Sequence, residues 1–175
     1  MEESEITHAE STQYCIAIHE AAHLVVRYLL FGNIDIIEYV NIIPHGNSLG
    51  RNKEDFGKKN DECANAFDYD VDFFEFGGYA FKECCYSLAG AVAEKVFFNL
   101  ENIPYDSASE DLGSLDSFIG LLCDEETFDS LVKDATPETE KIVRENIGLI
   151  KMIADALIST PEHQLDNHTL LDLLE

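Results

Sequence analysis

The chain has 175 residues, of which 46% are apolar, so it can bury a hydrophobic core and is not a disordered polypeptide. It carries 35 acidic and 11 basic residues, for a formal net charge of −24, and such a surface repels nucleic acid and anionic membranes. We therefore expect neither as a partner. Five cysteines without a C-x-x-C pair indicate reduced thiols, and the acidic N-terminus lacks the features of a signal peptide, so we expect a cytoplasmic protein.

A first helix is predicted to begin near Ser11 or Thr12, which are good N-cap residues, and to end at Gly32. Residues 14–31 are apolar almost all round the helix, which is typical of a buried helix. The longest apolar run within them is far short of a membrane span, and it carries the His and Glu residues as well. The exceptions share one side of the helix and form a narrow polar stripe: His19, Glu20, His23 and Arg27.

The stripe contains an H-E-x-x-H motif, residues 19–23. Residues i and i+4 lie one turn apart on a helix, so His19 and His23 can both bind one Zn²⁺. Glu20 can then act as the general base that accepts a proton from water. The alternative is a partly exposed helix face with three polar residues and no metal, and burial without partners would make that arrangement unfavourable.

Two strands are predicted next. Residues 34–44 are rich in β-branched and aromatic side chains and are ended by Pro44, and a second strand follows Gly50. The acid-rich stretch 51–78 is predicted to be mainly an irregular loop.

The remainder of the chain is predicted to be helical. A long helix covers residues 79–100, and Gly90 in its centre indicates close approach of another helix. After Pro104 we expect a helix capped by Ser107 or Ser109, a short helix over 124–135, and a longer helix that begins at Thr136 and Pro137 and runs to about residue 158. Residues 167–174 form a last helix. Residues 1–175 are thus predicted to be a single domain, mainly α with a small β-sheet (α+β).

A catalytic zinc site needs a third protein ligand. The extended motif H-E-x-x-H-x-x-G-x-x-H is absent, because Val26 and Leu29 occupy the later positions. Two acidic residues are candidates: Glu94, in the small-residue centre of the second long helix, and Asp111, near the start of the next helix. The spacing of residues alone does not choose between them.

Four stretches in the same order resemble the peptidase domain of the FtsH-type AAA+ zinc metalloproteases. They are HEAAH (19–23), VNIIPHGNSLG (40–50), LAGAVAEKVFF (88–98) and SASEDL (107–112). The C-terminal residues 149–174 are similar to the closing helices of that family. The resemblance covers about residues 12–174 and implies the helical peptidase fold of that family.

The resemblance implies that Asp111 is the third zinc ligand, and that Glu94 lies behind the ligands and orients one of them. This chain has Ala22 where the family has glycine. It contains no G-x-x-x-x-G-K-[ST] phosphate-binding loop and no membrane anchor, so we expect a free-standing peptidase domain. Such a domain is compatible with a separate ATPase partner or with assembly as a homo-oligomer.

The predicted function is zinc-dependent hydrolysis of short or unfolded polypeptides, with His19, His23 and Asp111 as ligands and Glu20 as the base. We expect the substrate to add as a strand along Tyr39, Val40, Asn41, Ile42 and Ile43. The alternative is a catalytically silent zinc domain that serves interaction or regulation. A structural site of that kind has no need of Glu20.

Overall fold

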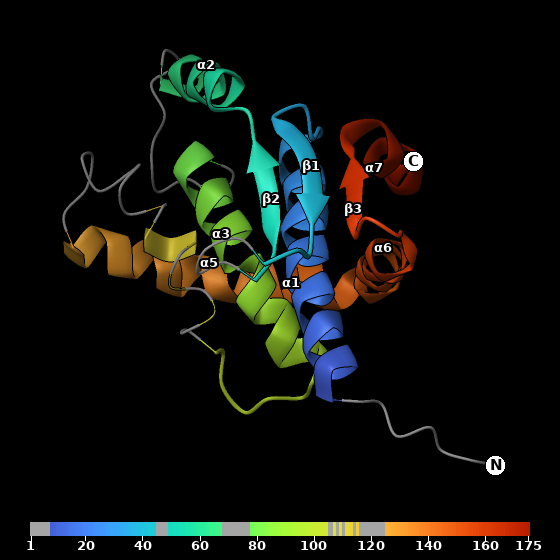
Figure 1. The fold of residues 1–175 in the computed structure, drawn as a ribbon. Helices are drawn as coiled ribbons and strands as arrows, with labels where there is room; N and C mark the ends of the chain where they lie inside the picture. The colour runs from blue at the N-terminus through green and yellow to red at the C-terminus, as the bar shows by residue number, and fades with distance from the viewer. Residues whose placement is uncertain are drawn as a thin grey trace.

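The computed structural model describes residues 8–44, 49–67, 78–104, 107, 109, 111–113, 115 and 125–175, without the side chains of 8–11 and 63–67. It is mostly helical and contains a small three-stranded antiparallel sheet (Figure 1), which confirms the α+β fold class.

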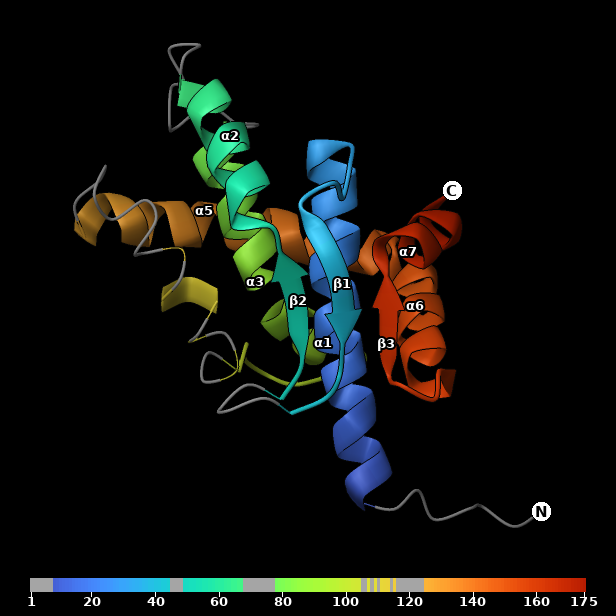
Figure 2. The same cartoon turned by 45° about the horizontal axis from the view of Figure 1, so that its top comes forward.

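The first helix, α1 (His8–Phe31), runs through the middle of the molecule (Figures 1 and 2). It begins before the expected N-cap residues and ends as predicted, where Gly32 has a φ of 74° and donates its N–H to the carbonyl oxygen of Tyr28. By length and composition alone, Thr12–Phe31 could cross a membrane, yet 56% of its most apolar window is buried inside the protein. Packing on several sides accounts for this composition.

The sheet consists of β1 (Ile37–Asn41), β2 (Arg51–Glu54) and β3 (Gln164–Asp166) in the order β2-β1-β3. It lies against α1 in both views (Figures 1 and 2). β1 is the central strand, so both of its edges are paired. The structure confirms a strand within residues 34–44 and another after Gly50. Three-residue β3 was not predicted, because a strand that short has no alternating pattern.

The prediction of an irregular loop over 51–78 is wrong for residues 56–67. Directly after β2, the expected second strand, these residues form the helix α2 (Phe56–Phe67). Asp55 starts this helix, because its Oδ1 accepts the N–H groups of Gly57 at 2.9 Å and Lys58 at 3.2 Å. The rest of the predicted loop, residues 68–77, lies outside the described residues.

The second long helix is α3 (Tyr79–Phe97), close to the predicted range. It ends before residue 100 because Asn99 takes the left-handed conformation, with a φ of 51°, and Leu100 donates its N–H to the carbonyl oxygen of Lys95. The predicted start of the next helix at Ser107 or Ser109 falls mostly outside the described residues. Residues 109, 111–113 and 115 are helical.

The prediction of two helices divided at Thr136 is wrong. One helix, α5 (Glu125–Glu145), continues through Pro137, and α6 (Ile147–Ser159) follows it. The last helix, α7 (Asn167–Leu174), matches its prediction, and Asp166 caps it by accepting the N–H of Thr169.

One hydrophobic cluster joins buried residues from Ala17 to Leu174. α3 and α6 pack beside α1, while α5 crosses behind α1 and α3 on the side away from the sheet (Figure 2). This arrangement holds the middle of α1 between the small residues of α3 and the strand β2, which positions the polar stripe.

Candidate metal centre

The structure brings together the three residues predicted to hold a metal. The Nε2 atoms of His19 and His23 lie 3.0 Å apart, and each lies 3.3 Å from Oδ2 of Asp111. A tetrahedral Zn²⁺ with ligand bonds of about 2.0–2.1 Å places its ligand atoms about 3.3 Å apart. The three atoms therefore have the spacing of one face of such a tetrahedron, and His19, His23 and Asp111 form a candidate metal-binding site.

The other ring nitrogen of each histidine has a partner that fixes its orientation. Nδ1 of His23 donates to the backbone carbonyl oxygen of Tyr86 at 2.7 Å, and Nδ1 of His19 lies 2.7 Å from Oε1 of Glu94. A carbonyl oxygen only accepts, so Nδ1 of His23 carries a hydrogen and Nε2 of the neutral ring keeps its lone pair for a metal. Glu94 holds the orientation of the His19 ring, as the carbonyl oxygen of Tyr86 holds that of His23.

The charges of His19 and Asp111 shift the pKa of each other. Burial lowers the pKa of an imidazole, but hydrogen bonds to Asp111 and Glu94 outweigh burial and raise the pKa of His19 to about 10. Burial acts to raise the pKa of Asp111, but the neighbouring His23 and His19 outweigh it and hold that pKa below its usual range. The carboxylates of Asp111 and Glu94 thus favour a positive charge next to the histidines. A divalent cation can supply that charge in place of the proton on His19.

Glu20 is 8% exposed and is held by β2. Nδ2 of Asn52 donates to Oε2 of Glu20 at 2.6 Å and to the backbone oxygen of Glu20 at 3.1 Å. Burial is the main reason that the pKa of Glu20 is raised, which suits a carboxylate that must accept a proton. Asn52 is a residue that the sequence did not point to, because its contact with Glu20 depends on the position of β2 beside α1.

Two glycines allow these side chains their positions. A Cβ at Gly90 would lie 2.3 Å from Nε2 of His19, so only glycine lets α3 lie so close to this ring. This confirms that the glycine marks close helix packing. A Cβ at Gly50 would lie 2.7 Å from Oε1 of Glu20, so the turn before β2 also requires glycine.

The site opens into a cavity of about 590 Å³. Its lining includes His19, His23 and Asp111, and it extends along β2 and α3 to Glu54, Lys59 and Glu83. Cys15 also lines it, as a free thiol whose pKa burial raises to about 11. Cys84 and Cys85 are free and buried in α3, while the side chains of Cys63 and Cys123 lie outside the described part.

The prediction that a substrate adds to the strand at Tyr39, Val40, Asn41, Ile42 and Ile43 is wrong for most of this stretch. Tyr39, Val40 and Asn41 are paired with both β2 and β3, and the N–H of Ile42 donates to the carbonyl oxygen of His163. No edge is left there for another strand. β2 is an edge strand within the described part of the chain, and its residues Arg51, Asn52 and Glu54 line the cavity.

No protein-family model matches this chain, and no curated protein matches it. The function must therefore be argued from the geometry of the candidate metal site, the buried glutamate beside it and the cavity into which both open.

Proposed function

We propose that this protein is a zinc metallopeptidase that hydrolyses short or unfolded polypeptides. The observation that carries the proposal is Glu20, a buried carboxylate that Asn52 holds in the same cavity as the three-ligand group. A site that only stabilises the fold has no use for a buried carboxylate beside its ligands, because burying that group is unfavourable. A hydrolase needs it as a proton acceptor.

In this proposal His19, His23 and Asp111 hold Zn²⁺, which matches their separations of 3.0–3.3 Å. Bound zinc supplies a Lewis acid that lowers the pKa of water and polarises a peptide carbonyl. Tyr86 and Glu94 keep the two imidazole rings in the orientation that leaves each Nε2 available.

Glu20 takes a proton from the water whose oxygen attacks the peptide carbonyl carbon. When the carbon–nitrogen bond breaks, Glu20 gives that proton to the leaving amine nitrogen, so its charge is restored at the end of the cycle. Asn52 holds Oε2 throughout, which leaves Oε1 to exchange the proton. The substrate binds as an added strand along the edge of β2, and not along residues 39–43.

The test compares purified wild-type protein with Glu20→Gln. We expect about one zinc per chain in both proteins by elemental analysis, and cleavage of unfolded casein by the wild type only. Loss of a general base lowers the rate by about 10²–10⁴-fold. Glu145→Gln, the same chemical change at an exposed position of α5, should cleave as the wild type does.

Two results would contradict the proposal in different ways. Zinc bound without cleavage of casein or of a peptide library would make the chain a catalytically silent zinc domain. Failure to bind zinc after reconstitution would remove the metal site altogether. An ATPase partner or self-association would bring folded substrates to the site, and the chemistry at Glu20 would stay the same.

A further inference from the structure

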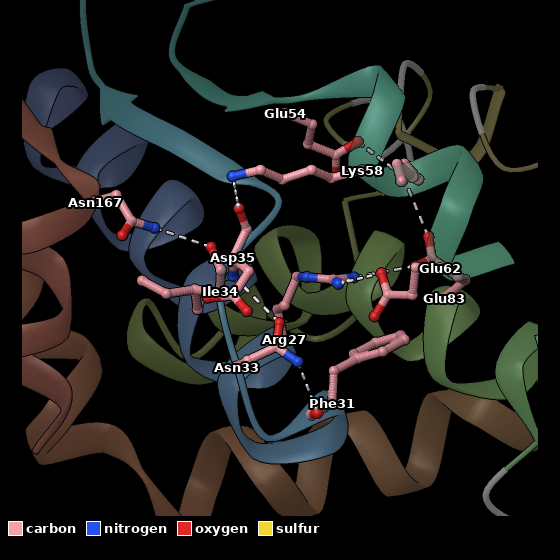
Figure 3. Close-up of polar contacts among 11 residues, drawn as sticks. Arg27, Phe31, Asn33, Ile34, Asp35, Glu54, Lys58, Glu62, Glu83 and Asn167 are labelled. Atoms are coloured by element: carbon pink, nitrogen blue, oxygen red, sulfur yellow. Dashed lines mark hydrogen bonds and ion pairs between the residues drawn. The ribbon is translucent and has the colours of Figure 1, made fainter. Parts of the chain in front are cut away.

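Beside the cavity lies a group of five charged side chains, three of which line it, here called the charged end: Arg27, Glu54, Lys59, Glu62 and Glu83. Arg27 is fully buried and donates from Nη1 to Glu83 at 3.2 Å and from Nη2 to Glu62 at 2.5 Å (Figure 3). Nζ of Lys59 lies 2.8 Å from Oε2 of Glu54 and 3.3 Å from Oε2 of Glu83. The group joins α1, β2, α2 and α3.

The charged end holds more negative than positive charge. Its three carboxylates, Glu54, Glu62 and Glu83, face two cations, Arg27 and Lys59, so these five described side chains together carry a formal charge of −1. The excess lies in a place where water is scarce, since Glu54 is 16% exposed and Glu83 is 2% exposed. Burial raises the pKa of Glu83, while the neighbouring Lys59 and Arg27 act to lower it. A third cation would remove the imbalance.

The charged end already binds an ammonium group. Nζ of Lys59 is held by two carboxylates and lies 5.8 Å from the centre of the Tyr86 ring. Carboxylates together with an aromatic face are the groups that recognise lysine and arginine side chains. Glu54, Lys59, Glu83 and Tyr86 all line the cavity, so a cation that enters the cavity can reach them.

The charged end lies within reach of a substrate bound at the metal site. Arg27 is four residues beyond His23 on α1, a rise of about 6 Å along the axis. Tyr86 links the two places, because its backbone oxygen holds His23 while its ring faces Lys59. Successive residues of an extended peptide are about 3.3 Å apart, so a residue next to the scissile bond can place its side chain there.

We propose that the charged end is the subsite for a lysine or arginine side chain, and that the substrates of this protein are basic polypeptides. This inference rests on the proposed peptidase function. The net charge of −24 acts in the same direction over a longer range, because it draws basic polypeptides toward the protein and repels acidic ones.

The first test measures binding separately from cleavage. Heptapeptides of alanine with lysine, arginine, glutamine or glutamate at the central position are titrated into zinc-supplemented Glu20→Gln protein at 0.15 M salt by calorimetry. We expect the lysine and arginine peptides to bind at least about tenfold more tightly than the glutamine peptide, and the glutamate peptide to bind most weakly. Equal affinities for the lysine and glutamine peptides would overturn the inference.

Variants separate the charged end from the general attraction of an acidic protein. Glu54→Gln removes one carboxylate and should lower the ratio of lysine to glutamine affinity about fivefold or more, whereas Glu38→Gln, at an exposed position of β1, should leave it unchanged. Lys59→Gln removes the cation of the chain itself and should raise the ratio, with exposed Lys58→Gln as its control. If circular dichroism shows that Glu54→Gln does not fold, the ratio of lysine to glutamine affinity in Lys59→Gln tests the inference instead. An unchanged ratio there would overturn the inference.

Cleavage of the same peptides by the wild-type protein distinguishes the two proposals. A preference for basic peptides in binding with no cleavage would keep the subsite and overturn the peptidase function. Cleavage with equal kcat/KM for lysine and glutamine peptides would keep the peptidase and overturn the subsite.

Discussion

Gly90 sets the distance between α3 and the ring of His19. A side chain there would have to share space with Nε2, the atom that faces Asp111 and His23. Gly148 offers a direct comparison, because it is also a glycine within a helix but has nothing within 4 Å of the place where a Cβ would lie. Gly90 lies in the middle of α3 and Gly148 in the first turn of α6, and only Gly90 has a side chain against it.

We predict that Gly90→Ala weakens zinc binding by at least about tenfold, because the His19 ring must move away from the ligand position. Overpacking should also destabilise the protein by about 1–3 kcal/mol, partly offset by the better helix propensity of alanine. Gly148→Ala should leave zinc affinity unchanged and stabilise the protein by up to about 1 kcal/mol. Competition with a chromophoric chelator measures the affinity. Wild-type affinity in Gly90→Ala would show that the contact with His19 does not matter.

At the scale of whole elements, tertiary packing keeps α5 helical across Pro137, a residue that usually ends or kinks a helix. Thr136 and Pro137 have the pattern of a helix start, yet the helix continues on both sides of them. Its buried residues occur before and after Pro137, from Leu131 to Val143, and pack against α3 as one face. The hydroxyl of Thr136 donates to the carbonyl oxygen of Val132, a bond that a helix interior also accommodates.

We predict that Pro137→Ala stabilises the protein. A proline inside a helix costs about 3 kcal/mol, and the gain is reduced by about 0.4–1 kcal/mol because alanine loosens the unfolded chain. A net gain of about 2 kcal/mol should raise the Tm by about 4–8 °C in a protein of this size. Calorimetry measures the shift. The matched control is Pro161→Ala, in the exposed turn after α6, which should not raise the Tm. A lower Tm for Pro137→Ala would mean that the proline relieves a clash.

At the scale of the whole molecule, the dominant electrostatic property is the excess of 35 acidic over 11 basic residues. Like charges repel one another more strongly in the compact state than in the expanded one, so the net charge reduces the stability of the fold. Ion pairs such as Arg144 with Glu140 contribute little in return, because exposed pairs are worth about 0–1 kcal/mol.

We predict that salt stabilises this protein. Raising sodium chloride from about 0.01 M to about 1 M shortens the screening length from about 30 Å to about 3 Å, which weakens the repulsion between distant carboxylates. The Tm should therefore rise over this range. Potassium chloride should have nearly the same effect, since screening depends on ionic strength rather than on the identity of the ion. A Tm that falls with salt would show that attractive pairs outweigh the net charge.

Much of the candidate site could be predicted from residues close together in sequence. The pair His19 and His23 with Glu20 follows from helix spacing alone, and the structure brings Asp111 to them with Glu94 behind His19. Asn52, Gly50 and the carbonyl oxygen of Tyr86 could not be predicted in these roles, because each acts through a neighbour at least 30 residues away in sequence.

The sequence by itself determined the mainly helical fold class, the buried character of α1 and the H-E-x-x-H motif, because these depend on side-chain spacing within one element. Only the tertiary structure decided that β1 is a central strand and β2 an edge, that residues 56–67 form a helix, and that α5 continues through Pro137. The physical reason is that these features are stabilised by contacts between elements far apart in sequence. Strand order, the packing of α5 on α3 and the ion pairs of Arg27 and Lys59 are such contacts, and a local sequence pattern carries no information about them.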